Sequence, residues 1–459
     1  MKSRFWQRPL RAALAAALLG SSSAASAAGY SVVYNPYADV DWASTLRCQS
    51  EHHDHAYDAP KITALSNAGY CAVTFMTYSG DYRPQPPATW IANGSPNPDP
   101  GVATGWGEYR RWPPESYGAP ALPLNSLRFY LPGAEEVGLV GGTPGHQVHT
   151  AHMLALGLSE YIEGVGCDSC GNDGSAVHND NPFALPESHR YSSESDFVAK
   201  VVALGAIPVL AHPNGPPTQY DFISPYPKAV EMYNNYHALF DDGTAAQVPG
   251  CLSGPSNLIG QMRAVWDHVL LTKSPRIWGI AVNDWGSAWT PLGISSTPCW
   301  AEITPTNRDR GKTQVLLPSY DLQSYLQAFA AGAFFAVVEN NAVKAAYPTV
   351  TGINVTYNSI SITTADGDET VTWIGNGQVV AAGFTLDLSN LPADLVYARA
   401  EIDDGEGRVV YTQPFSLGDP VPPPPDAPVP SLSEEAAALL GLALLLIVLW
   451  KAPSSTARA

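Results

Sequence analysis

Helical and strand-like hydrophobic patterns alternate along the first three quarters of the chain. Apolar residues recur with helical spacing at 62–68, 193–204, 255–271 and 320–331. Short continuous apolar runs predict buried strands at 69–75, 127–131, 153–157, 206–211 and 277–282. Because helices alternate with strands, we expect an α/β domain with a mostly parallel sheet, either open or closed into a barrel.

After about residue 347 the hydrophobic pattern changes to a period of two. Alternating segments lie at 353–357, 359–363, 370–374, 384–388 and 395–402, separated by Gly, Asp and Asn. This pattern predicts a small β-sandwich-like domain over residues 348–418. The domain contains no catalytic motif, so we expect it to pack against the first domain, to act as a spacer or to present the first domain.

The two ends of the chain carry hydrophobic segments of another kind. Residues 1–27 combine basic residues, a short apolar run and a small-residue cleavage site, which is typical of a signal peptide. The apolar run is shorter than the roughly 20 residues that span a bilayer. A proline-rich linker with a sorting motif occupies 419–435, and an apolar helix with a short tail occupies 436–459. We therefore expect an exported protein of the periplasm or cell surface, anchored in the membrane by its C-terminal helix.

Residues 429–434 (VPSLSE) give this C-terminal segment a resemblance to sorting signals of the PEP-CTERM and IPTL-CTERM kind. Glu435 stands where that motif has a tryptophan. The resemblance implies a Gram-negative envelope protein that is retained in the membrane or processed by a dedicated sorting peptidase. An ordinary membrane anchor is the alternative, and it leads to the same location.

Net charge argues against one class of partner, and the cysteine content indicates how the cysteines are used. The formal net charge is −18 and basic residues are scarce, which argues against nucleic-acid binding through a broad basic face. All six cysteines lie in the mature chain, and an even count in an exported protein favours disulfides. Cys167 and Cys170 have zinc-knuckle spacing, but without a second such pair a local disulfide or loop staple is the preferred interpretation.

Residues of metal-ligand type lie next to the predicted strands. Glu135 follows one strand, His152 precedes another, and His212 and Asp284 follow two more. The carboxyl ends of strands in α/β folds meet at one edge, so we expect these side chains to converge. Imidazole and carboxylate ligands suit zinc, manganese or iron, and one or two such ions would activate water and hold a phosphate.

Several motifs resemble, in order and spacing, those of the PHP (polymerase and histidinol phosphatase) superfamily. They are 131–135 (LPGAE), 152–157 (HMLALG), 208–214 (PVLAHPN), 229–234 (AVEMYN) and 278–284 (WGIAVND). The resemblance implies that residues 28–347 form a distorted (β/α)7 barrel of the kind found in metal-dependent phosphoester hydrolases. It also implies that Glu135, His212 and Asp284 are metal ligands, with His152 as a further ligand. Glu231 is expected to brace the barrel mouth rather than to bind metal.

The chain also departs from that family. The opening His-x-His pair is matched by His53 and His55 only after a small shift in register, and a solvated surface loop is the alternative for this segment. The Thr-Asp-His motif is replaced by residues 74–76 (TFM), and the histidine expected after Asp284 is Gly286. Two interpretations remain: a metal-dependent phosphoesterase with a reduced site that acts on a small phosphoester, and a catalytically decayed scaffold that binds a surface ligand or partner.

Overall fold

The computed structural model describes residues 29–54, 59–76, 121–136, 151–158, 163–164, 190–191, 193–241, 257–284, 311–339 and 348–419. The chain divides into two units, Met1–Gly418 and Asp419–Ala459. The predicted signal peptide, the anchor helix and all but the first residue of the linker lie outside the described residues. No helix within the described residues is long and apolar enough to cross a membrane.

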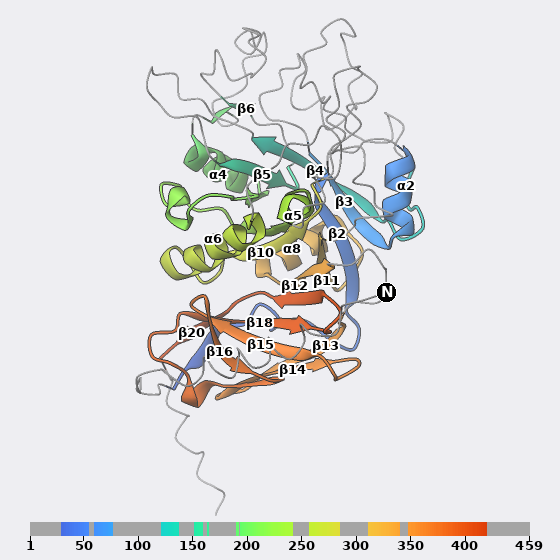
Figure 1. Ribbon diagram of the computed structural model, residues 1–459. Coiled ribbons are helices and arrows are strands. Elements are labelled where there is room, and N and C mark those ends of the chain that lie inside the picture. The colour runs from blue at the N-terminus through green and yellow to red at the C-terminus, as the bar shows by residue number, and fades with distance from the viewer. Residues whose placement is uncertain are drawn as a thin grey trace, which may run out of the picture. The chain divides into compact units, whose positions relative to one another are not determined.

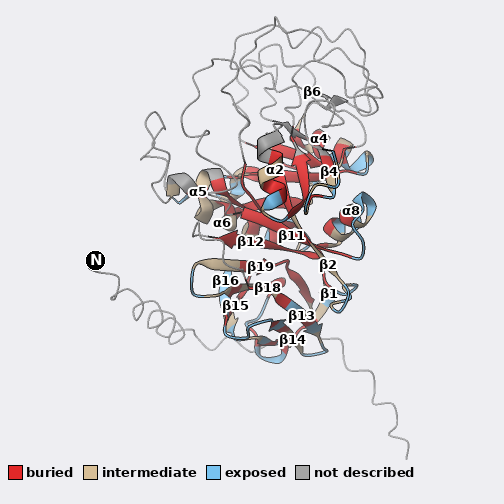
Figure 2. Cartoon of the chain, turned by 90° about the vertical axis from the view of Figure 1, so that its right-hand side faces the viewer, coloured by how far each residue is buried: buried red, intermediate tan, exposed pale blue. Residues whose placement is uncertain are grey.

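The α/β part of the chain is built on a curved mixed sheet. In sheet order its strands are β12 (Phe334–Glu339), β11 (Gly311–Leu317), β2 (Leu46–Asp54), β3 (Tyr70–Phe75), β4 (Phe129–Glu136), β5 (His152–Leu156), β8 (Ile207–Ala211), β9 (Ala229–Asn234) and β10 (Trp278–Val282). The helices are α2 (Ala59–Asn67), α4 (Glu194–Ala203), α5 (Asn235–Asp241), α6 (Leu258–Thr272) and α8 (Leu322–Ala331), with a 3-10 helix η4 (Pro217–Tyr220). Two very short strands, β6 (Glu163–Gly164) and β7 (Arg190–Tyr191), pair separately. Figure 2 shows that the strands carry most of the buried residues.

Strand direction differs from the mostly parallel sheet expected from the sequence. Strands β2, β3 and β4 are parallel, and so are β8, β9 and β10. Strand β5 runs antiparallel to both of its neighbours, β4 and β8. Consequently β2, β4, β8, β9 and β10 all run in one direction, and β5 begins at the edge where these strands end.

The ladder of the described strands does not close, so the predicted (β/α)7 barrel is not confirmed. Strand β10 pairs with β9 alone in the described part of the chain. The sheet nevertheless curls until β10 lies against β11, where a Cβ on Gly311 would come within 2.3 Å of the Val282 carbonyl oxygen. Thr313 Oγ1 donates a hydrogen bond to the carbonyl of Ala281 at 3.1 Å across this seam. Side chains, rather than a backbone ladder, therefore join the two ends of the curved sheet.

The β-rich part contains β1 (Ser31–Tyr34), β13 (Val350–Val355), β14 (Ser359–Thr364), β15 (Thr370–Gly375), β16 (Gln378–Ala382), β17 (Thr385–Asp387), β18 (Tyr397–Asp403), β19 (Arg408–Thr412) and β20 (Phe415–Gly418), with a 3-10 turn η7 (Leu388–Asn390). The sheet β13–β14–β17 shares one apolar core with β15, β18 and β19, as in a β-sandwich. Strand β1, from the range assigned to the first domain, pairs with β20.

The two parts of the chain form one continuous structure through β12, which pairs antiparallel with β19 (Figure 1). Arg399 on β18 makes a two-point contact with Asp267 on α6, at 3.0 and 3.1 Å. Gln413 accepts a hydrogen bond from the N–H of Gly279 at 2.8 Å and donates one to its carbonyl at 2.9 Å. The free edge of β10 is thereby occupied by a side chain from the β-rich part.

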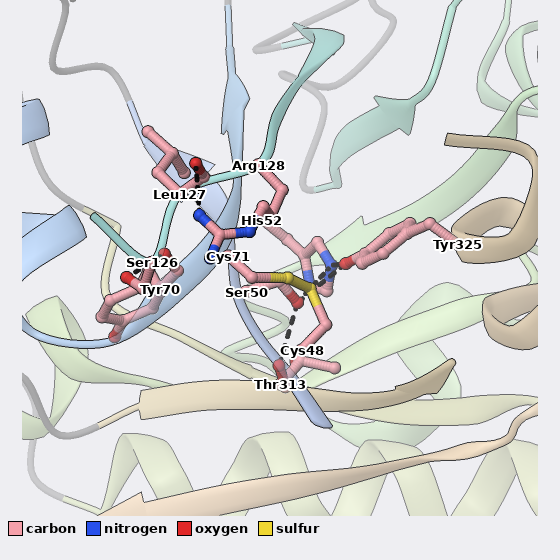
Figure 3. The surroundings of a disulfide bond; sticks show 10 residues. All are labelled: Cys48, Ser50, His52, Tyr70, Cys71, Ser126, Leu127, Arg128, Thr313 and Tyr325. Carbon is pink, nitrogen blue, oxygen red and sulfur yellow. Dashed lines mark hydrogen bonds between the residues drawn. A yellow bond between two sulfur atoms is a disulfide. The ribbon is translucent and has the colours of Figure 1, made fainter. Parts of the chain in front are cut away.

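A disulfide joins Cys48 on β2 to Cys71 on β3, with a Cα–Cα distance of 5.3 Å (Figure 3). Both cysteines are buried. This bond agrees with the disulfides expected from the even cysteine count. The other four cysteines, including the Cys167 and Cys170 pair, lie outside the described residues.

Candidate metal centre

Three side chains that are far apart in the sequence meet at one edge of the curved sheet. His53 lies in β2, His212 directly follows β8, and Asp284 lies two residues after β10. One ligand atom from each residue lies within 4.8 Å of the others, so the three form a group that can hold a metal ion. All three lie at the carboxyl ends of strands that run in the same direction, which is the reason that they converge.

Glu231 on β9 connects these candidate ligands. Its Oε1 accepts a hydrogen bond from Nδ1 of His53 at 2.7 Å, and its Oε2 accepts one from the backbone N–H of His212 at 2.7 Å. The amide of Asn234 donates to Glu231 Oε2 at 3.0 Å and to Asp284 Oδ2 at 3.1 Å. The expectation that Glu231 braces the site agrees with these contacts.

Electrostatics at Glu231 define the tautomer of His53. Burial by itself would raise the pKa of Glu231, but the interactions with His53, His212 and Asn234 hold this pKa below its ordinary value. Because an ionised carboxylate can only accept, Nδ1 of His53 carries the shared proton. In the neutral form of His53, which is the form that binds a metal, the lone pair lies on Nε2, 3.4 Å from Asp284 Oδ1. Metal-binding imidazoles usually donate their other ring N–H to a carboxylate in this way, which fixes the tautomer and the orientation of the ring.

Backbone conformation also distinguishes two of the candidate ligands. His212 has φ 22° and Asp284 has φ 55°, both in the left-handed region that non-glycine residues seldom adopt. Such conformations cost free energy and persist where the surrounding structure enforces them, which is common at functional sites. The hydrogen bond from the His212 N–H to Glu231 is one of the contacts that hold this backbone in place.

Two further imidazoles surround His212. The ring centroid of His152 lies 4.8 Å from that of His212 in an edge-on arrangement, and the ring of His237 stacks at 5.0 Å. Burial, reinforced by the neighbouring histidines, holds the pKa of His237 well below its ordinary value, so this ring is neutral at pH 7. The rings of His152, His212 and His237 are half-buried, whereas His53 is fully buried below them.

The structure brings some of the predicted ligands together, whereas the side chains of others lie outside the described residues. His53, His212 and Asp284 come together, and His152 lies beside them because β5 starts at the same edge, opposite Ala211 in the ladder. The backbone of Glu135 pairs with Leu154 near the end of β4, but its side chain is outside the described residues, as is the whole of His55. The alternative of a solvated loop is wrong for His52 and His53, which are buried in β2.

His237 was not predicted from the sequence. It lies on α5, three residues after the end of β9, and its N–H donates to Asn234 Oδ1 at 3.3 Å. The rule that located His212 and Asp284, namely a ligand-type residue just after a buried strand, would also have located His237.

His52 points to the opposite face of β2 from His53. Its Nε2 contacts the hydroxyls of Tyr325 and Ser50 next to the disulfide (Figure 3). Burial lowers the pKa of His52 to about 3. His52 is therefore a neutral residue of the core and takes no part in the group formed by His53, His212 and Asp284.

No protein-family model and no curated protein matches this sequence. Among solved structures, the chain is similar to a two-domain protein from Bacteroides vulgatus that contains a predicted PHP-like metal-dependent phosphoesterase. The sequence identity is 12% and the TM-score 0.34, over 84% of this chain and 98% of that chain. Similarity of this degree supports no inference, so the site is interpreted from its own geometry.

Proposed function

We propose that the protein is a metal-dependent phosphoester hydrolase with a reduced metal site. The observation that carries the proposal is the convergence of His53, His212 and Asp284 within 4.8 Å of one another. Two imidazoles and one carboxylate are the donor set that zinc, manganese or iron accepts. A divalent ion held there supplies Lewis acidity and lowers the pKa of water at the site.

Each neighbouring residue has a definable part in this function. Glu231 holds the proton on Nδ1 of His53 and thereby makes Nε2, which lies 3.4 Å from Asp284 Oδ1, the ligand nitrogen. Asn234 orients the carboxylate of Asp284 through the hydrogen bond to Oδ2. The rings of His152 and His237 lie 4.8 and 5.0 Å from the ring of His212, and their nitrogens are suited to contact a phosphoryl oxygen or a second ion.

The choice of a phosphoester as substrate rests on the sequence. The motifs around His212, Glu231 and Asp284 resemble those of the PHP superfamily, whose free-standing members are mostly phosphoester hydrolases. The geometry agrees with that resemblance, because a buried carboxylate-backed imidazole beside an aspartate suits metal-assisted hydrolysis.

The location of the protein is part of the same proposal. The leader at 1–27 and the apolar segment at 436–459 support export and anchoring in the cell envelope, with a sorting peptidase as a partner. The disulfide between Cys48 and Cys71 supports an oxidising compartment. Fractionation of cells that express the full chain tests this assignment: recovery from the soluble cytoplasm would contradict it.

Elemental analysis of the purified full chain tests the metal centre. We expect at least one stoichiometric transition metal, and we expect its loss in His212→Ala. Glu369→Gln is a matched control, because Glu369 is a buried carboxylate of the β-rich part that accepts from Thr364 and Gly367. Metal-free protein of full stability would overturn the proposal and favour a ligand-binding scaffold.

The reaction itself is tested with aryl phosphate mono- and diesters in the presence of added manganese, zinc or iron. We expect turnover that disappears on chelation and returns when the metal is restored. His212→Ala should be inactive under every condition. A wild-type chain that retains its metal but hydrolyses neither ester would contradict the assignment as a phosphoesterase.

A further inference from the structure

Strand β2, which carries His53, and strand β10, which ends two residues before Asp284, are not joined by a ladder in the described part of the chain. Strand β2 pairs with β3 and β11, whereas β10 pairs with β9. Backbone hydrogen bonds between these strands therefore do not set the distance from His53 Nε2 to Asp284 Oδ1, which is 3.4 Å. Another contact has to hold the two strands in register.

Glu51 makes that contact. It lies two residues before His53, and its Oε1 accepts a hydrogen bond from the His53 backbone N–H at 3.0 Å. The same carboxylate accepts from the backbone N–H of Asn283 at 3.2 Å, and its Oε2 accepts from Asn283 Nδ2 at 2.8 Å. Because Asn283 immediately precedes Asp284, one side chain holds the backbone next to both candidate ligands. We call this set of contacts the Glu51–Asn283 bridge.

The bridge extends to the other strands around the seam. Asn283 Nδ2 also donates to the hydroxyl of Tyr70 on β3 at 3.1 Å, and Asn283 Oδ1 accepts from the N–H of Gly311 on β11 at 3.0 Å. Glu51, Asn283 and Tyr70 have no exposed surface. In such surroundings the loss of one hydrogen-bond partner leaves a buried polar group unsatisfied.

We propose that Glu51 is a positioning residue of the metal centre, fixing the separation of His53 and Asp284 across the open seam through the Glu51–Asn283 bridge. The proposal rests on the metal-dependent function proposed above. Glu51 does not itself contact the metal in this scheme. It acts through the backbone of β2 and through Asn283. Asn283 immediately precedes Asp284, whose backbone is in the left-handed region.

The test is the variant Glu51→Gln in the full chain. The glutamine amide has one accepting oxygen where the carboxylate has two, so the donors on one side of the bridge face an N–H instead, and the bridge is weakened without a change in side-chain size. We expect the dissociation constant for cobalt or zinc, measured by competition with a chelator, to rise by about tenfold to a hundredfold. In metal-free protein, we expect faster hydrogen exchange at the amides of His53 and Asn283.

Ser50→Ala is the matched control. Ser50 precedes Glu51, is equally buried, and donates to the Thr313 carbonyl at 2.9 Å on the opposite face of β2. We expect this variant to lower the free energy of unfolding while leaving metal affinity and both amides unchanged. Asn283→Ala provides a second disruption, and its effect on affinity should not add to that of Glu51→Gln.

The possible outcomes separate the two proposals. A Glu51→Gln chain that is destabilised but binds metal as tightly as wild type, with both amides protected, would overturn the positioning role. A second outcome is that the wild-type chain binds no metal, while the amides of His53 and Asn283 are protected in the wild type and lose protection in Glu51→Gln. This outcome would overturn the hydrolase proposal and the role of Glu51 in it. It would leave the bridge as a purely structural contact.

Discussion

Glu231 and His53 are joined by a hydrogen bond of 2.7 Å between Oε1 and Nδ1, with both side chains buried. This contact determines which nitrogen of His53 is available as a ligand. The other oxygen of Glu231 accepts the N–H of His212, so one carboxylate governs the orientation of two candidate ligands from different strands. Substitutions in this small group therefore make specific predictions.

Glu231→Gln should weaken metal binding more than it weakens the fold. The glutamine amide cannot accept from both His53 and His212, so His53 loses its fixed tautomer. We expect metal affinity to fall by about tenfold to a hundredfold, as for other carboxylates that hydrogen-bond a metal-binding histidine. Chelator competition measures this change, with Glu369→Gln as control. Equal effects of the two variants on affinity would contradict a specific role for Glu231.

Asp284→Asn and Asp284→Ala should differ in stability but not in metal binding. Both remove the charged ligand, so we expect both to lose the metal. Asparagine tolerates the left-handed backbone at φ 55°, whereas alanine there costs about 1 kcal/mol more. Urea unfolding of the metal-free variants measures this difference. The exposed Asp394, with φ 65°, is a matched control in which the same pair of substitutions should show the same difference without any effect on metal.

His52 should make the free energy of unfolding decrease as the pH falls below about 6.5. Burial lowers its pKa from 6.5 to about 3, so between these two pH values the imidazole is protonated in the unfolded chain and neutral in the folded chain. The stabilisation is complete above pH 6.5 and is lost as the pH falls toward 3. One such group contributes at most about 5 kcal/mol, with a slope of about 1.4 kcal/mol per pH unit.

The variant His52→Gln checks this prediction, because glutamine keeps a polar group near Tyr325 but does not titrate. We expect its free energy of unfolding, measured in urea between pH 7 and pH 4, to fall less steeply than that of the wild type. Parallel curves for the two proteins would show that His52 does not cause the acid sensitivity.

Gln413→Met should destabilise the protein by breaking the contact between β10 and the β-rich part. The variant leaves the N–H and carbonyl of Gly279 without their partner in a buried position. Each unsatisfied group costs about 1–3 kcal/mol. Urea unfolding measures the loss, and the exposed Gln378 provides the control Gln378→Met, which we expect to be neutral. A neutral Gln413→Met would contradict the role of this side chain at the edge of β10.

The sequence alone determined the elements and several members of the site. Hydrophobic periodicity located α4, α6, α8 and the strands β3, β4, β5, β8 and β10, since each must bury an apolar face, but it did not locate β2, β9, β11 or β12. It also separated the α/β part from the β-rich part, where the period becomes two. The position of His212 and Asp284 directly after buried strands was sufficient to predict that they approach each other, because parallel strands end at one edge.

Only the tertiary structure decided the strand directions, the open seam of the sheet and the hydrogen bonds that hold the candidate ligands. Periodicity does not distinguish parallel from antiparallel strands, so the reversal of β5 and the open seam at β10 were not predictable. Glu51, Glu231 and Asn283 act through hydrogen bonds to residues from distant parts of the chain. Such partners depend on which strands become neighbours, and that is fixed by packing of the whole chain rather than by any local pattern.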